Sequence, residues 1–138
     1  MNQPRCVCLI DDDEDDYYFF KMVIDAFEHR IELAYHKDGE TAFKKLSDTN
    51  SEAPDLLFLD WNMPKWTGKQ CLMAIRELPG YSEVPIIIYT TSNETKDKDD
   101  ARQLGASYFL SKPASISQLY KELEHIFSLN WKKERIRM

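Results

Sequence analysis

The feature that most constrains the fold of this sequence is the regular alternation of short apolar runs with longer amphipathic or charged stretches. Nearly unbroken apolar runs are typical of strands buried on both faces, and apolar residues spaced three or four apart are typical of helices. The expected strands cover 6–10, 31–35, 56–59, 85–89 and 107–110, and the expected helices cover about 13–29, 40–47, 68–78, 94–104 and 115–131. Such alternation predicts parallel strands joined by right-handed crossovers. We therefore expect an α/β fold, a three-layer α/β/α sandwich with a five-stranded parallel sheet.

Residues at the expected helix ends support these boundaries. Asp13 and Ser115 stand where an N-cap is needed, and Gly105 stands where a helix needs a left-handed C-cap. The acidic run from Asp13 to Asp16 suits the positive end of a helix dipole. We therefore expect that run to be a solvated helix start.

The size and charge of the chain limit its class. With 138 residues, 43% of them hydrophobic, it fits one domain, which we assign to residues 1–138 with a core at about 5–128 and a basic extension at 129–138. Its 18 Lys and Arg against 24 Asp and Glu give a net charge of −6, which argues against a nucleic-acid partner. The first apolar stretch is too short for a signal peptide or a membrane span. We expect a cytoplasmic protein.

Polar side chains follow the strands at the edge of the sheet where they end. Asp11 and Asp12 follow the first strand, Asp60 the third, Thr90 the fourth, and Lys112 the fifth. Ligands of open parallel sheets bind at this edge. Crowded carboxylates repel one another and lose hydration, and a hard cation such as Mg²⁺ relieves both effects. With a hydroxyl and an ammonium nearby, these residues predict a site for forming an aspartyl phosphate.

Four motifs carry a resemblance to a known family. They are the acidic pair at 11–12, Asp-Trp-Asn-Met-Pro at 60–64, Ile-Ile-Tyr-Thr-Thr-Ser at 87–92 and Ser-Lys-Pro at 111–113. In this order, they resemble a CheY-like response regulator receiver domain, over residues 6–127. The resemblance implies a (βα)5 flavodoxin-like fold and a role in two-component signal transduction. It also implies a sensor histidine kinase or histidine phosphotransfer protein as phosphoryl donor, and a downstream protein as target.

The resemblance assigns the acids of the site. Asp60 would be the phosphoacceptor. Asp11, Asp12, Asp60 and the backbone carbonyl of Asn62 would bind Mg²⁺, or Mn²⁺ in its place. The chain would then be a phosphoacceptor signalling domain that assists its own phosphorylation and dephosphorylation, rather than an enzyme acting on other molecules.

The resemblance also assigns the switch. Lys112 would contact the phosphoryl group and Thr90 would shift towards it. Phe109 would be the aromatic partner of Thr90, at a position where Tyr is common in the family. Pro113 would follow its lysine through a cis peptide bond, which proline permits at low cost.

The resemblance also raises the question of how such a domain would pass its signal on to a target. The basic tail at 129–138 is too short to form a DNA-binding domain, so output would be by protein contact. A tail that extends the last helix would support a homodimer through the helix at 94–104, the strand at 107–110 and the last helix.

Two other classes share parts of the pattern. A haloacid dehalogenase-type phosphohydrolase would use Asp11-x-Asp13 with Thr90 and Lys112, but it would leave Asp60 without a role. A pseudo-receiver would bind partners without phosphorylation, and the full set of acids and lysine argues against it. Which aspartate becomes phosphorylated, Asp11 or Asp60, distinguishes the first alternative.

The cysteines and two tryptophans have a structural interpretation. No Cys-x-x-Cys motif or zinc spacing is present, so we expect Cys6, Cys8 and Cys71 to be buried thiols. Trp61 and Trp66 have two interpretations, as exposed recognition residues or as support around the site, and the sequence does not favour the first.

Overall fold

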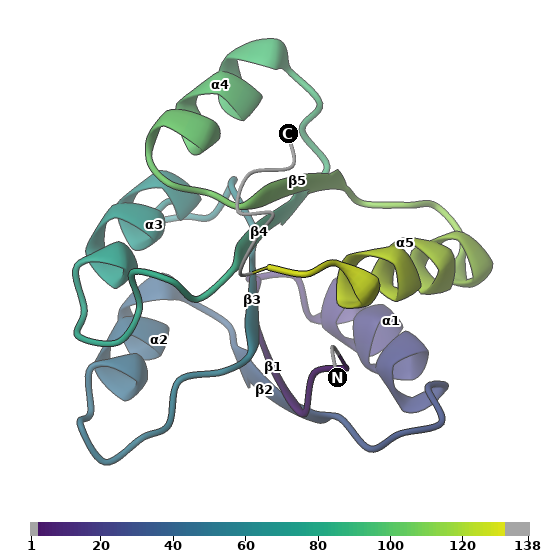
Figure 1. Ribbon diagram of the computed structural model, residues 1–138. Coiled ribbons are helices and arrows are strands. Elements are labelled where there is room, and N and C mark those ends of the chain that lie inside the picture. The colour runs from purple at the N-terminus through teal and green to yellow at the C-terminus, as the bar shows by residue number, and fades with distance from the viewer. Residues whose placement is uncertain (1–2, 132–138) are drawn as a thin grey trace.

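The computed structural model describes residues 3–131, which form one parallel sheet flanked by helices (Figure 1). The strands are β1 (Cys6–Ile10), β2 (Glu32–His36), β3 (Leu56–Leu59), β4 (Ile86–Thr90) and β5 (Tyr108–Ser111), and the helices are α1 (Glu14–Asp25), α2 (Gly39–Leu46), α3 (Gly68–Arg76), α4 (Thr95–Gln103) and α5 (Ile116–Ser128). The strand order is β2-β1-β3-β4-β5. The predicted α/β/α sandwich is confirmed. The order reverses between β1 and β3, which is where such sheets bind ligands.

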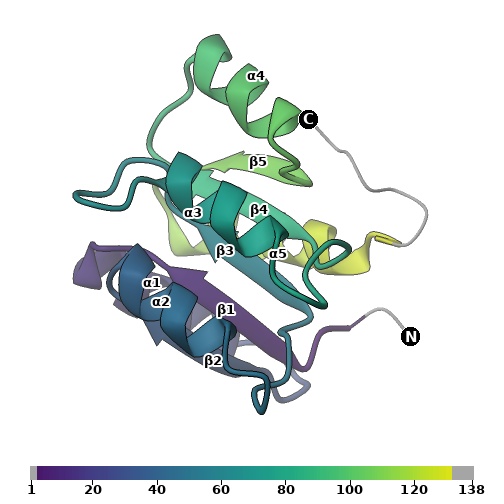
Figure 2. The ribbon, with the colours of Figure 1, turned by 90° about the vertical axis from the view of Figure 1, so that its left-hand side faces the viewer.

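Helices cover both faces of the sheet, and the strands therefore carry apolar residues on both sides. Figures 1 and 2 show α1 and α5 on one face and α2, α3 and α4 on the other. In β1, Val7 and Leu9 join the core under α1 and α5, whereas Cys8 and Ile10 join the core under α2 and α3. This alternation explains why the predicted strands read as continuous apolar runs.

The predicted helix boundaries are close to the observed ones where the helices start, and they are less accurate where the helices end. Asp13 caps α1 by accepting from the backbone N–H groups of Asp15 and Asp16, and Ser115 caps α5. Helix α1 ends at Asp25 rather than near residue 29, and α5 ends at Ser128, so the prediction that Trp131 continues its stripe is wrong. The chain leaves α5 in an extended conformation, and residues 132–138 of the predicted tail lie outside the described part.

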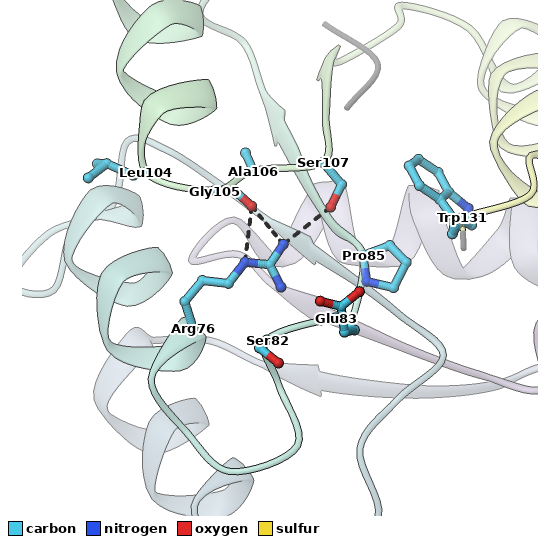
Figure 3. A pocket seen from close by; sticks show the side chains of 9 residues that line it. All are labelled: Arg76, Ser82, Glu83, Pro85, Leu104, Gly105, Ala106, Ser107 and Trp131. Carbon is cyan, nitrogen blue, oxygen red and sulfur yellow. Dashed lines mark hydrogen bonds between the residues drawn. The ribbon is translucent and has the colours of Figure 1, made fainter. Parts of the chain in front are cut away.

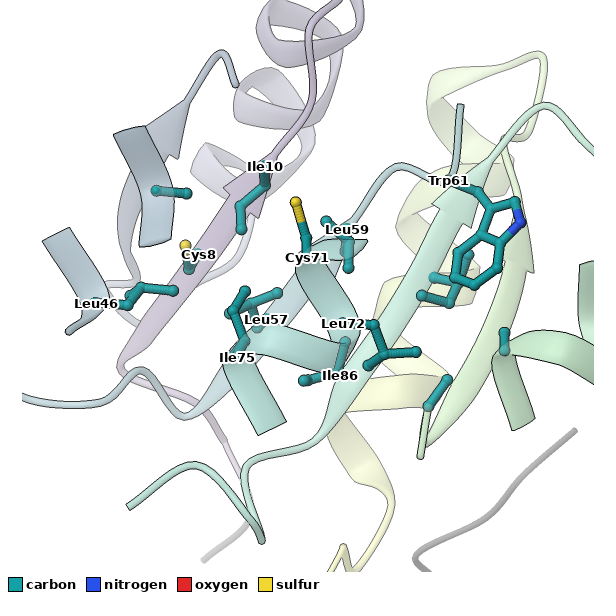
Figure 4. Packing of buried hydrophobic residues seen from close by; sticks show 14 of the residues in the cluster. Cys8, Ile10, Leu46, Leu57, Leu59, Trp61, Cys71, Leu72, Ile75 and Ile86 are labelled. Atoms are coloured by element: carbon teal, nitrogen blue, oxygen red, sulfur yellow. The ribbon is translucent and has the colours of Figure 1, made fainter. Parts of the chain in front are cut away.

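The core beneath α2 and α3 contains two of the cysteines (Figure 4). Cys8 and Cys71 are each 1% exposed, and burial raises the pKa of their thiols to about 12 and about 11. Trp61 is buried in the same core and Trp66 packs against it. Both tryptophans therefore support the loop after β3, which is one of the two interpretations that the sequence leaves open, while Cys6 is partly exposed rather than buried.

Arg76 is the last residue of α3 and lies near the edge of the sheet opposite the predicted site. Its side chain connects neighbouring loops there by hydrogen bonds (Figure 3). Its Nε and Nη2 donate to the carbonyl of Gly105, its Nη1 to the carbonyls of Tyr81 and Val84, and its Nη2 also to Ser107 Oγ. These contacts use all five N–H groups of the guanidinium. Arg76 lines a cavity of about 370 Å³, but it has no donor left for a ligand there. Its role is to hold the α4–β5 connection against α3.

We expect Arg76→Lys to lower the free energy of unfolding by about 2–4 kcal/mol, because an ammonium cannot replace the guanidinium fork and leaves buried carbonyls unsatisfied. Urea denaturation measures this change. Arg102→Lys is the matched control, since Arg102 is exposed and contacts Asp99 at 3.4 Å. It should change stability by less than about 0.5 kcal/mol. Equal losses in the two variants would contradict the assigned role of Arg76.

Candidate functional site

The acids of the candidate site meet because β1 and β3 are neighbours. Ile10 pairs with Leu59, and the backbone N–H of Asp60 donates to the carbonyl of Ile10 at 3.0 Å. This register places the residues after the two strands side by side. One carboxylate oxygen each from Asp11, Asp12 and Asp60 lies within 4.8 Å of the others. Asp11 is 0% exposed and Asp60 is 5% exposed, whereas Asp12 is open to solvent.

Lys112 brings a cation to these acids from the loop after β5. Its backbone N–H donates to the carbonyl of Thr90 at 2.8 Å, which fixes the start of the loop. Its Nζ lies 2.9 Å from Asp11 Oδ2 and 3.6 Å from Asp60 Oδ2, and the side chain is 8% exposed. The ammonium also lies 5.4 Å from the centre of the Tyr89 ring. The structure therefore joins the predicted lysine to two of the three predicted acids.

Burial and charge oppose each other in this cluster. Burial raises the pKa of Asp11 from 3.8 to about 7, and the charge of Asp60 adds to the increase, although the contact with Lys112 counteracts it. Burial alone would lower the pKa of Lys112, but its contacts with Asp16 and Asp11 and the charge of Asp60 together hold that pKa above its ordinary value. The lysine thus remains charged beside a carboxyl group that ionises with difficulty.

The donor set fits a hard divalent cation. Asp11 Oδ2 is buried and, among the described residues, receives no hydrogen bond of good geometry, since its 2.9 Å contact with Lys112 is an ion pair of poor angle. A buried oxygen of this kind, next to the solvent-exposed carboxylate of Asp12, is a suitable ligand for Mg²⁺ or Mn²⁺. The backbone N–H of Asn62 donates to Asp60 Oδ1 at 3.4 Å. The role of the Asn62 carbonyl as a ligand stays a prediction.

The two predicted switch residues lie on neighbouring strands, Thr90 at the end of β4 and Phe109 in β5. Thr90 is buried at the end of β4, and its Oγ1 accepts from the backbone N–H of Ser92 at 3.4 Å. Phe109 is half-buried in β5, and the Nζ of Lys98 in α4 lies 5.7 Å from its ring centre. Their role as switch residues stays a prediction.

The predicted cis bond at Pro113 is wrong. Residues 3–131 contain no cis peptide bond, so Lys112 joins Pro113 through a trans bond. The trans isomer is the more stable one for proline, by about 0.5–1 kcal/mol. Lys112 reaches Asp11 and Thr90 with this geometry, so the observed contacts do not require the other isomer.

Three residues that shape the site were not predicted from the sequence. Asp16, expected to be solvated, contacts Lys112 Nζ through Oδ2 at 2.7 Å, and Tyr35 donates its hydroxyl to the carbonyl of Asp11 at 2.8 Å. A Cβ at Gly68 would overlap the carbonyl oxygen of Asp60, so only glycine lets α3 begin this close to the loop after β3. Of these residues, Asp16 could have been found from its position, because it lies on the first turn of the helix that directly follows the acidic pair.

The comparisons with known proteins identify the class. A model of the response regulator receiver domain matches residues 7–124, and the chain therefore belongs to this family. Response regulator Rcp1 of Synechocystis is 28% identical over 131 residues, which are 92% of this chain and 89% of that protein. Chemotaxis protein CheY of Pseudomonas aeruginosa is 32% identical over 90 residues, 65% of this chain and 70% of that one. The family match excludes the phosphohydrolase alternative.

Solved structures agree with this assignment. The phosphorylated cyanobacterial phytochrome response regulator RcpA superposes with a TM-score of 0.81 at 25% identity, over 88% of this chain and 90% of that one. The Mn²⁺-bound form of Rcp1 gives a TM-score of 0.80 at 26% identity, over 98% of this chain and all of that one. Within residues 3–131, no helix has the length and apolar character needed to cross a bilayer.

We expect the affinity for Mg²⁺ to fall as the pH is lowered below about 7. Because the pKa of Asp11 is raised to about 7, a proton occupies this carboxyl at lower pH, and it must leave before the oxygen can bind metal. Each unit of pH below that value should weaken apparent affinity by up to about tenfold. Isothermal titration calorimetry between about pH 5 and 8 measures the effect. The Asp11→Asn variant should lose this pH dependence, and a wild-type affinity that is constant over the range would contradict the expectation.

Proposed function

We propose that this receiver domain acts as a phosphorylation switch with Asp60 as the phosphoacceptor. The observation that carries the proposal is the cluster at the end of β1 and β3, where the carboxylate of Asp60 lies among the oxygens of Asp11 and Asp12. The ammonium of Lys112 lies 3.6 Å from Asp60 Oδ2. A nucleophile, two further acids and a cation are the parts that phosphoryl transfer to a carboxylate requires.

The reaction is a displacement at phosphorus. A carboxylate oxygen of Asp60 forms a bond to phosphorus while the bond from phosphorus to the donor breaks, and the electron pair of that bond stays with the donor. Asp11, Asp12 and Asp60 would hold Mg²⁺ or Mn²⁺, which neutralises charge on the phosphoryl oxygens. Lys112 stabilises a second oxygen, and Thr90 donates its hydroxyl to a third. The contacts of both residues hold them at the same edge of the sheet as Asp60.

The output is a change in protein contacts. Thr90 and Phe109 couple the new charge to the surface of α4, β5 and α5, where a downstream protein, or a second copy of the chain, binds. The donor is a sensor histidine kinase or a histidine phosphotransfer protein in the cytoplasm. The phosphorylated state described for RcpA and the Mn²⁺ described for Rcp1 support this scheme, as does the net charge of −6, which disfavours a nucleic-acid target. We propose that residues 1–138 act as one domain.

Incubation with acetyl phosphate and Mg²⁺ should add one phosphoryl group to the wild-type protein and none to Asp60→Asn, because the amide is not a nucleophile. Intact-protein mass spectrometry measures the adduct. The Asp25→Asn variant should behave as the wild type, since Asp25 is an exposed carboxylate that pairs with Lys21 on α1. Removal of Mg²⁺ with a chelator should abolish the adduct in every sample.

Each other result contradicts a specific part of the proposal. An adduct that persists in Asp60→Asn would move the acceptor to another residue, with Asp11 as the first candidate. An unmodified wild-type protein, in the presence of both acetyl phosphate and a phosphorylated histidine phosphotransfer protein, would favour a pseudo-receiver that binds partners without phosphorylation.

A further inference from the structure

The shortest side-chain contact of Lys112 with an acid involves Asp16, which lies outside the predicted site. Asp16 Oδ2 lies 2.7 Å from Lys112 Nζ, compared with 2.9 Å for Asp11 Oδ2 and 3.6 Å for Asp60 Oδ2. A separation of 2.7 Å is that of a short charge-assisted hydrogen bond. Asp16 belongs to α1, so this contact joins α1 to the loop after β5 across 96 residues of sequence.

Asp16 is a rigid point of attachment for the lysine. It lies in the first turn of α1, and its backbone N–H donates to the capping carboxylate of Asp13 at 3.3 Å. Its side chain is 32% exposed, whereas that of Lys112 is 8% exposed. The lysine therefore extends through the buried part of the site, above the Tyr89 ring, and ends against a helix terminus whose position is fixed.

Asp11 cannot serve as this point of attachment while it binds metal. The atom of Asp11 that contacts Lys112 is Oδ2, the same buried oxygen that lacks a hydrogen bond and suits a cation. A metal ion and an ammonium repel each other and compete for that atom. Of the three carboxylates around the lysine, Asp16 is the one outside the acid cluster, so its contact is compatible with an occupied metal site.

With this contact in place, the ammonium lies a short distance from the acceptor without bonding to it. At 3.6 Å the ammonium is beyond hydrogen-bonding distance of Asp60 Oδ2, so that oxygen keeps its lone pairs for attack. A phosphoryl oxygen attached to Asp60 would extend past the carboxylate, towards the ammonium. Lys112 has three N–H groups and can bond to Asp16 and to that oxygen at the same time.

We propose that Asp16 is a positioning residue for phosphoryl transfer: it anchors the Lys112 ammonium beside Asp60 when metal takes the Asp11 oxygen that the ammonium otherwise contacts at 2.9 Å. This inference rests on the proposed function. Without the Asp16 carboxylate, the ammonium keeps only Asp11 and Asp60 as partners, so it competes more strongly with metal for Asp11 and approaches the nucleophile. Its effect is on the rate of transfer and on metal affinity, rather than on the existence of the acceptor.

The test compares Asp16→Asn with Asp15→Asn. Both variants remove one negative charge from the first turn of α1, but Asp15 is exposed. At saturating Mg²⁺, the maximal rate of phosphorylation by acetyl phosphate should fall by about tenfold in Asp16→Asn, with little change in the half-saturating concentration of acetyl phosphate. In Asp15→Asn both should stay within about twofold of wild type. Asp16→Glu, which keeps the charge and can reach the lysine, should recover most of the rate.

A calorimetric Mg²⁺ titration without phosphoryl donor tests the inference separately from the proposed function. Affinity for Mg²⁺ should be several-fold weaker in Asp16→Asn than in Asp15→Asn, and urea denaturation should show both variants folded. Equal Mg²⁺ affinities and rates in the two variants would overturn the role of Asp16. A faster reaction in Asp16→Asn would overturn it too, because it would mean that Asp16 restrains the lysine. If the wild type takes no phosphoryl group yet the Mg²⁺ affinities differ as expected, the positioning of Lys112 stands and the proposed function fails.

Discussion

The burial of two carboxylates next to each other, with one lysine between them, is the constraint on which the site depends. Asp11 is 0% exposed and Asp60 5% exposed, and carboxylates that lose contact with water in this way need a partner of opposite charge. Lys112 supplies that cation at 2.9 Å and 3.6 Å. Because the lysine stands far from both acids in the sequence, the site exists only when β1, β3 and β5 are ordered in one sheet. The pairing of Lys112 with Asp11 and Asp60 therefore requires the complete fold.

Much of this fold was predictable, because its strands are buried on both faces and its helices begin with recognisable caps. The unbroken apolar runs of β1 and β3, and the caps at Asp13 and Ser115, are local signals that the sequence carries directly. The ends of α1 and α5 were predicted too late, since apolar residues beyond a helix can still pack against the core. Trp131 does so from outside α5, with its Nε1 donating to the carbonyl of Ile126 at 3.2 Å.

The candidate site was predictable as a set of residues but not as a set of distances. The acidic pair, Asp60, Thr90 and Lys112 each follow a strand, and the topology of a parallel sheet collects them at one edge. Asp16 was missed because an acidic residue in the first turn of a helix is already explained by the helix dipole, without a distant partner. Only the three-dimensional structure shows that it faces a lysine 96 residues away. The trans bond at Pro113 was missed because the resemblance, and no local signal, suggested the other isomer.

The contacts that surround Thr90 give a physical basis for transmission from the site to the surface. Its carbonyl accepts from the Lys112 backbone and its hydroxyl accepts from the Ser92 backbone, while Ser92 Oγ donates to Asp97 at 2.5 Å in the first turn of α4. Helix α4 buries Ala101 and lacks a side-chain hydrogen bond at its N-cap, so the bond from Ser92 to Asp97 is a side-chain contact at its start. If the Thr90 hydroxyl turns towards a phosphoryl oxygen, Ser92 loses an acceptor next to the start of that helix. A change at the buried site therefore has a short chain of contacts to the start of α4, which is the kind of connection a two-state switch requires.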